Sequence, residues 1–207
     1  MNKIILSLLF TLALLNSAVA AQGNVDAGKV KSAMCAGCHG IDGNSLVPMY
    51  PKLAGQNASY LAKQLADFKV GATSGGKDGR NDPIMAGMVM ALSAVDMADL
   101  AAYFSAQTTT QNATSNKTTS GEKIYLGGDS DRGIPACAGC HGIKGGGMAS
   151  AGFPALASQN SEYIKNQLMK FRAASRANDK NAMMRHVAAE LSDNEIIQLA
   201  QHTASLK

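Results

Sequence analysis

The sequence predicts an all-α protein made of two tandem helical domains that are related by an internal duplication. Apolar residues recur at the three- and four-residue spacing of helices, and no run alternates as a half-buried strand would. The block CAGCHGIDG, which begins at Cys35, returns as CAGCHGIKG at Cys137, an offset of 102 residues. A chain of 207 residues also suits two small domains better than one large domain.

The first segment of the chain has the pattern of a secretory signal peptide. Lys3 is followed by an apolar stretch from Ile4 to Leu15 and then by the small-residue sequence AVA, which ends at Ala20. The apolar stretch is shorter than a membrane span requires, although an uncleaved anchor remains the alternative. We therefore expect cleavage after Ala20 and export to a bacterial periplasm.

The rest of the chain divides by composition. The polar, threonine-rich sequence QTTTQNATSNKTTS lacks apolar periodicity and is typical of a linker. We expect the signal peptide at 1–20, the first domain at 21–106, the linker at 107–120 and the second domain at 121–207.

Each domain carries one Cys-x-x-Cys-His motif, and together the two motifs use all 4 cysteines. Two thiols at this spacing can both add to the vinyl groups of one haem, and the adjacent histidine then reaches the iron. A zinc knuckle, a thioredoxin-like pair and a disulfide framework are the alternatives. Zinc needs four ligands per site, and no further cysteine or regularly spaced histidine follows either motif. We predict two covalently bound haem c groups (iron), attached through Cys35, Cys38, Cys137 and Cys140, with His39 and His141 on the iron.

The prolines Pro51 and Pro154 occupy matching positions after the two motifs, at an offset of 103 residues. A proline carbonyl at this place can accept the Nδ1 hydrogen of the axial histidine, which fixes the orientation of the ring. A simple turn proline explains the position equally well, and the sequence leaves both interpretations open.

Several helices are predicted in each domain. A short helix from Asp26 to Cys35 leads into the first motif. A three-four stripe follows in each half, and it consists of Tyr60, Leu61, Gln64, Leu65 and Phe68, and of Tyr163, Ile164, Gln167, Leu168 and Phe171. The last helix of each domain opens with a capping box, at Ser93 and at Ser192.

The second axial ligand decides whether a haem can bind oxygen or peroxide or only exchange electrons. The run around Met85, Met88 and Met90 offers three sulfurs in the first half, and Met183 and Met184 offer two in the second. Met85 lies eight residues before Ser93, and Met184 lies eight before Ser192. Because only this pair is in register with the capped helices, we predict Met85 and Met184 as the metal ligands and the other methionines as packing.

Two histidines compete with this assignment. His186 follows Met184 by two residues, and His202 replaces Tyr103 in the last helix. Neither has a counterpart in the first half, so we expect His202 to serve in packing and neither to hold iron.

Composition agrees with bound cofactors and argues against nucleic acid. The aromatic content is 5% and tryptophan is absent, which leaves a weak core for domains of this size unless two haems fill them. The formal charge is +4, but the basic residues are dispersed and haem propionates would offset them.

The sequence resembles the cytochrome c4 family over essentially its whole mature length. The first half carries CAGCHGIDGNS and NDPIMAGM, and the second carries GIPACAGCHG and AGFPALASQN. The resemblance implies two cytochrome c-like domains, packed pseudo-symmetrically with their haems close together and each iron bound by histidine and methionine. It also implies a periplasmic electron carrier, often membrane-associated, that takes electrons from a quinol–cytochrome c reductase and passes them to a haem-copper terminal oxidase.

Two other functions remain alternatives to a carrier. The chain could be the haem-bearing electron-transfer subunit of a flavoprotein dehydrogenase, such as a sulfide dehydrogenase. It could also be an enzyme itself, for example a dihaem peroxidase, but no distal acid–base group stands in register to support that. We therefore expect no catalytic residues of its own.

Overall fold

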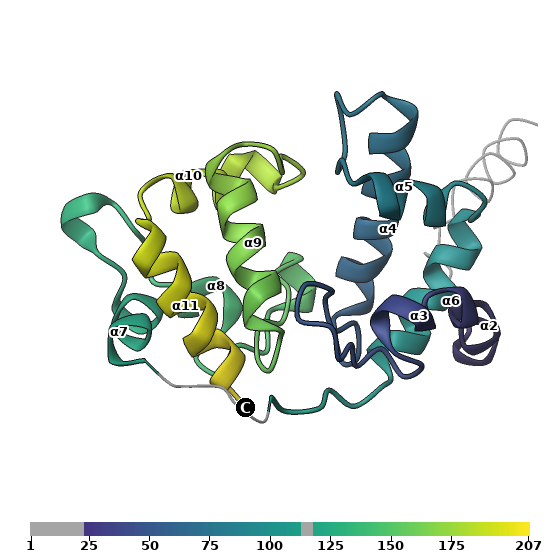
Figure 1. The fold of residues 1–207 in the computed structure, drawn as a ribbon, viewed down its shortest axis with the longest axis horizontal. Coiled ribbons are helices and arrows are strands. Elements are labelled where there is room, and N and C mark those ends of the chain that lie inside the picture. Colours follow the sequence, from purple (N-terminus) through teal and green to yellow (C-terminus); the bar gives the residue numbers. More distant parts are fainter. Residues whose placement is uncertain (1–22, 113–117) are drawn as a thin grey trace, which may run out of the picture.

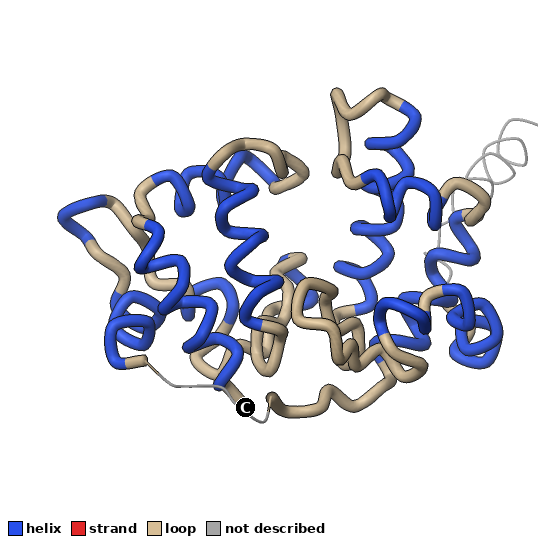
Figure 2. Tube along the Cα trace, in the orientation of Figure 1, coloured by secondary structure: helices blue, strands red, loops and turns tan. Residues whose placement is uncertain are grey.

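The computed structural model describes residues 23–112 and 118–207. The predicted signal peptide and the middle of the predicted linker lie outside the described residues. The chain forms two helical domains that lie side by side, and residues 106–112 run along one edge of the pair (Figure 1). Helices and loops make up the described parts of both domains, and no strand is drawn in either (Figure 2).

The two domains use the same order of helices. The first contains α2 (Val25–Lys31), α3 (Ala36–His39), α4 (Ala58–Thr73), α5 (Pro83–Val89) and α6 (Ala94–Ser105). The second contains α7 (Thr119–Gly127), α8 (Ala138–His141), α9 (Ser161–Arg172), α10 (Met183–Ala189) and α11 (Asp193–Ser205). The remaining regular pieces are short 3-10 turns and two isolated bridges, Asp129 with Ile134 and Met148 with Phe153. The expected all-α duplication is confirmed.

The predicted apolar stripes form the core of each domain. Leu61 of α4 packs with Leu100 and Phe104 of α6, and all three side chains are buried. In the second domain, Ile196 and Leu199 of α11, which match Met97 and Leu100, are buried in the core. Burial of these faces holds the short helices in place, because helices of this length are marginal on their own.

The first helix of each domain packs closely against the last. A Cβ atom on Gly28 would meet the carbonyl oxygen of Asp99 at 2.0 Å, and one on Gly121 would meet that of Gln198 at 2.3 Å. Only glycine permits this approach, and it recurs at equivalent places in the two repeats.

Both predicted capping boxes are present. The Ser93 hydroxyl accepts from the Asp96 amide while the Asp96 carboxylate accepts from the Ser93 amide. Ser192 and Glu195 repeat the pattern at the start of α11. These boxes fix the first residue of each terminal helix, and therefore the distance along the chain from α5 to α6 and from α10 to α11.

The described parts of the predicted linker make contacts with both domains. Thr118, near the end of that segment, caps α7. The part before residue 113 is held to the first domain. Thr110 donates its amide hydrogen to Asn44 Oδ1 at 2.8 Å, and the buried Lys52 ammonium donates to Thr110 O and to Asn112 Oδ1. The Asn112 side chain also donates across to the second domain, to the carbonyl oxygens of Ser158, Gln159 and Ala204.

The domains also touch directly, through loops that follow the two Cys-x-x-Cys-His motifs. Asn57 donates its side-chain amide to the carbonyl of Phe153 at 2.9 Å, and Asn160 donates to that of Tyr50 at 2.8 Å. Asn57 and Asn160 are equivalent in the two repeats, as are Tyr50 and Phe153. The contact is therefore reciprocal, as a pseudo-two-fold arrangement requires.

Membrane-spanning helices were also considered in the described part of the chain. No single helix there is long and apolar enough to cross a bilayer, and the pair α5 and α6, which is apolar enough when taken together, bends by 111°.

Candidate haem-binding sites

Both Cys-x-x-Cys-His motifs fold in the same way. Each forms a single helical turn, α3 or α8, closed by a bond from the histidine amide to the carbonyl of the first cysteine, at 3.0 Å for His39 and 2.9 Å for His141. All four cysteines are free of disulfides. A helical turn places residues three and four positions apart on one face, so the two thiols and the histidine of each motif serve a single ligand.

The two predicted axial histidines are oriented by the two prolines. His39 Nδ1 lies 2.9 Å from Pro51 O, and His141 Nδ1 lies 2.9 Å from Pro154 O. A carbonyl oxygen can only accept, so Nδ1 carries the proton in each ring and Nε2 keeps its lone pair. This geometry decides between the two interpretations of the prolines in favour of the carbonyl acceptor. It is the arrangement by which proteins hold and tune an imidazole that binds a metal.

Burial reinforces the neutral state of both rings. His39 and His141 are 8% and 7% exposed, and this burial lowers the pKa of each imidazole despite its bond to the proline carbonyl. The ring centres of Tyr50 and His39 lie 6.2 Å apart, and those of Phe153 and His141 are separated by the same distance. A buried neutral imidazole with a free Nε2 is the form that binds iron.

The cysteines do not fit the competing chemistries. Burial raises the pKa of the Cys35 thiol, and it raises the pKa of Cys137 to about 11. Thioredoxin-like cysteines show the opposite shift. Within residues 23–112 and 118–207, no three His, Cys, Asp or Glu side chains are placed to hold a metal ion, which argues against a zinc knuckle. The residues present fit a covalently attached haem better than any of the alternatives.

The predicted methionine ligands lie at the starts of two short helices. Met85 is in the first turn of α5, where its amide donates to the capping Asp82 carboxylate at 3.2 Å. Met184 is the second residue of α10. Both side chains are half-buried, whereas the neighbouring Met90 and Met183 are 47% and 36% exposed. Exposure favours the predicted pair over these two neighbours. The half-buried Met88 is not separated from Met85 in this way, and the ligand assignment stays a prediction.

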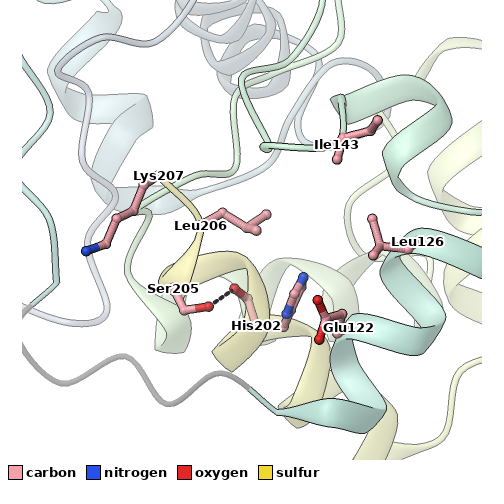
Figure 3. Close-up of a pocket in the computed structure, with 7 residues that line it drawn as sticks. All are labelled: Glu122, Leu126, Ile143, His202, Ser205, Leu206 and Lys207. Carbon is pink, nitrogen blue, oxygen red and sulfur yellow. Dashed lines mark hydrogen bonds between the residues drawn. The ribbon is translucent and has the colours of Figure 1, made fainter.

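The two competing histidines lie elsewhere. His186 is exposed on α10. His202 is 1% exposed, and its ring packs 5.2 Å from that of Tyr125. Figure 3 shows His202 on the wall of a surface pocket between α7 and α11, where its ring and the Glu122 carboxylate point toward each other. Packing is thus the role that the structure assigns to His202.

A pair of tyrosines was missed by the sequence analysis. Tyr103 of α6 donates its hydroxyl to the carbonyl of Ile41 at 3.0 Å, and Tyr125 of α7 donates to that of Gly142 at 2.6 Å. Both bonds hold the chain just after the predicted axial histidine, but they come from the last helix in one domain and the first helix in the other. His202 stands where the second domain would have its counterpart of Tyr103. Because the two tyrosines lie on different helices of their domains, a comparison of the repeats by a fixed offset cannot find their shared role.

Comparison with known proteins agrees with the duplication. The profile of the cytochrome c family matches residues 25–108 and again residues 118–207. A cytochrome c4 of Stutzerimonas stutzeri is 46% identical over 210 aligned positions that cover 100% of both chains. The crystal structure of reduced recombinant cytochrome c4 from Pseudomonas stutzeri superposes with a TM-score of 0.86 at 44% identity, covering 89% of this chain and 100% of that one.

A second type of relative is also similar. The thiosulfate dehydrogenase electron acceptor of Stutzerimonas stutzeri strain A1501 is 37% identical over 177 aligned positions. The alignment covers 83% of this chain and 78% of that protein.

Proposed function

Since this chain belongs to the cytochrome c4 family and holds two covalently bound haem c groups, we propose that it carries electrons between respiratory-chain partners in the periplasm. The single observation that supports this most strongly is the repeated orientation of His39 by Pro51 and of His141 by Pro154. Two sites of the same design in one chain suit transfer of electrons through the molecule better than a division of labour between a catalytic and an auxiliary haem.

Each bound haem supplies one-electron exchange between ferric and ferrous iron. The residues of the chain set the conditions for that exchange. The proline carbonyls fix the tautomer and the basicity of the imidazoles, and the helix cores exclude water around them. With Met85 and Met184 on the remaining positions, both irons would be closed to small molecules. Histidine with methionine raises the reduction potential and leaves electron transfer as the available reaction.

The proposed donors and acceptors are those that the resemblance to the cytochrome c4 family implies. A quinol–cytochrome c reductase would deliver electrons, and a haem-copper terminal oxidase would receive them, with peripheral association at the membrane bringing the partners together. The processed form would begin at Ala21, in keeping with the AVA sequence before it.

The test uses purified holoprotein and membranes that lack soluble cytochromes. Under this proposal, adding the ferrous protein restores oxygen consumption that is sensitive to cyanide, and the rate saturates with protein concentration. A variant Met85→Ala/Met184→Ala, which opens both irons, serves as the control for unspecific reduction. If the wild-type protein is not oxidised faster by membranes than in buffer, the proposed acceptor is wrong.

A second candidate function is that of an electron-accepting subunit for a dehydrogenase. The observation that favours it is the similarity to a thiosulfate dehydrogenase electron acceptor. Our sequence analysis instead suggested a flavoprotein such as a sulfide dehydrogenase. Mixing the ferric protein with each dehydrogenase and its substrate distinguishes the cases, because the true partner would reduce both haems at submicromolar enzyme and the other would not.

We also propose that the chain is not an enzyme. A dihaem peroxidase needs one iron with an open or displaceable site. The predicted ligand set leaves none, so addition of hydrogen peroxide to the half-reduced protein should give no catalytic turnover. Rapid peroxide consumption by the wild type would contradict this.

A further inference from the structure

Two arginines are buried between the domains. Arg80, from the loop between α4 and α5, is 8% exposed, and Arg176, from the loop between α9 and α10, is 6% exposed. Each guanidinium lies 4.5 Å from the centre of a phenylalanine ring of its own domain, Phe68 for Arg80 and Phe171 for Arg176. Stacking of this kind holds the planar groups in fixed orientations.

Both guanidiniums donate to the same two amide oxygens. Gln64 Oε1, on α4, accepts from Arg80 at 2.9 Å and from Arg176 at 3.0 Å. Gln167 Oε1, at the equivalent place on α9, accepts from Arg80 at 2.8 Å and from Arg176 at 2.9 Å. Because they share acceptors from both domains, the two positive charges lie close together in one cluster.

The loops that carry the two arginines differ in length. The Arg80 amide donates to Asp67 O at 2.8 Å, and the Arg176 amide donates to Lys170 O at 3.0 Å. Asp67 and Lys170 are equivalent in the repeats, yet the intervening loop is much longer in the first domain. Gly79 closes that longer loop at a φ of +73°, where a Cβ atom would meet Asp67 O at 2.3 Å. Two loops of different length thus bring an arginine amide to equivalent carbonyls in the two domains, which indicates a shared requirement for the guanidinium.

The positive charges have no anionic partner in the described parts of the chain. Among residues 23–112 and 118–207, no carboxylate lies within ion-pair distance of either guanidinium, and the acceptors are neutral amides and the hydroxyls of Tyr60 and Tyr163. Asp67 is reached only indirectly, through Asn178. Although burial acts to raise the pKa of Tyr163, the two guanidiniums lower it. Two buried like charges are costly without a counter-ion, so the cluster suits a bound anion.

The position of the cluster indicates which anion this is. The loops that orient the predicted axial histidines meet at the interface through Asn57 and Asn160. Arg80 and Arg176 precede Met85 and Met184 in the sequence, and these methionines would bind the iron opposite the histidines. A haem held between histidine and methionine has its edge between these two layers. Its vinyl edge is tied to the cysteines, so its carboxylates lie on the opposite side of the macrocycle.

We propose that Arg80 and Arg176 form one cationic pair that binds the haem carboxylates at the domain interface and serves both haems at once. The proposal requires the two bound haems but neither of the partners named under the proposed function. Because each arginine faces both domains, loss of either one should affect both haems. The pair would also couple the irons, since a change of charge at one haem is felt by the shared counter-ion of the other.

The test measures the holoprotein alone. Arg80→Gln and Arg176→Gln remove one charge each, and spectroelectrochemical titration should show that each variant lowers both midpoint potentials, because a nearby cation favours the ferrous state. Arg80→Lys keeps the charge and should recover most of the shift. Lys77→Gln and Lys180→Gln, which remove one exposed charge from each of the same two loops, should leave both potentials near wild type.

A second readout follows the carboxylates themselves. Haem made from 5-aminolevulinic acid labelled with ¹³C at the carboxyl carries the isotope only in its propionates, so the redox-difference infrared spectrum identifies their stretching bands. The wild-type bands should shift on Arg80→Gln and on Arg176→Gln and not on Lys77→Gln. Near-ultraviolet circular dichroism and haem content establish that each variant is folded. Unshifted bands in folded variants, or a shift of only one potential, would overturn the proposal.

Discussion

Gln56 and Gln159 occupy equivalent positions in the two repeats, and each binds the backbone of one residue in the opposite domain. The two residues that they bind, Ala155 and Lys52, are equivalent as well. Gln56 exchanges two hydrogen bonds with Ala155, at 2.9 and 2.8 Å. Gln159 exchanges two with Lys52, both at 2.8 Å. Each amide acts as donor and acceptor toward one residue, as a neighbouring strand would. The pseudo-two-fold relation of the domains is thus fixed at the level of individual hydrogen bonds.

Replacing either glutamine should weaken the contact between the domains to a similar extent. Gln56→Leu leaves the Ala155 amide and carbonyl without their partner, and Gln159→Leu does the same to Lys52. We expect each change to lower the free energy of unfolding by about 1–3 kcal/mol. Denaturant titration of the holoprotein, followed by haem absorption, measures the loss.

The matched control is Gln107→Leu, because the side-chain amide of Gln107 donates to Tyr103 O, within its own domain. In the double variant Gln56→Leu/Gln159→Leu, NMR relaxation should report shorter rotational correlation times for the domains than in wild type. A double variant that tumbles as one body would show that these bonds do not hold the domains together.

The methionine assignment makes a separate prediction. Met85→Ala and Met184→Ala should each remove about half of the weak far-red absorption band of ferric haem with methionine ligation, and each should open one iron to carbon monoxide. Met88→Ala and Met183→Ala are the controls and should leave the band intact. Loss of the band in a control variant would show that the register argument chose the wrong sulfur.

Features that repeat in the sequence could be predicted from it. The stripes, the capping boxes at Ser93 and Ser192, and the match of Pro51 with Pro154 each depend on short-range patterns that survive in both halves. The structure confirms the helices and boxes, and it shows the histidine–proline bonds that the sequence left as one of two interpretations.

The interface could not be predicted in the same way. Gln56 and Gln159 lie in loops, five residues after a proline. Glutamine side chains in loops are normally solvated, so only the tertiary arrangement shows what they bind. Arg80 and Arg176 do not align by a fixed offset, because the loops before them differ in length. The short helix α7 begins within a threonine-rich segment whose composition is typical of a linker.

The second capping box should make stability depend on pH in the acid range. The pKa of Glu195 is lowered from its ordinary 4.5 to about 2, mainly by the hydrogen bond from Arg132. The Ser192 amide and hydroxyl lower it further. A carboxyl with a lowered pKa stabilises the fold above its unfolded value, and that contribution disappears as pH falls from about 4.5 toward 2.

Glu195→Gln should therefore lower the free energy of unfolding by roughly 1 kcal/mol at pH 7, which is the upper range for a solvent-screened ion pair. Near pH 2 the same change should lower it by almost nothing. Urea titrations at the two pH values measure the difference. Glu190→Gln, a few residues earlier in the chain, is the control for removal of a carboxyl group outside the capping box. An equal loss at both pH values would mean that the capping hydrogen bond, and not the charge, carries the effect.

The attachment of the haems can be checked by mass. The mature protein should begin at Ala21 and, after extraction with acid and acetone, should exceed the mass of the polypeptide by two haem groups. Thioether bonds survive this treatment, whereas a haem held by axial ligands alone is lost. Cys137→Ser/Cys140→Ser should retain one haem, in the first domain, and intact wild-type protein that retains one haem would contradict two attachment sites.

The rate of electron transfer between the haems, after photoreduction by a single electron, tests the account most directly. Tunnelling falls off exponentially with distance, so two haems held in one rigid body should equilibrate in a fast phase whose rate is independent of protein concentration. Gln56→Leu/Gln159→Leu should slow that phase without changing haem content. An equilibration rate that rises in proportion to protein concentration would show that electrons pass between molecules, and it would contradict a single electron path through the two domains.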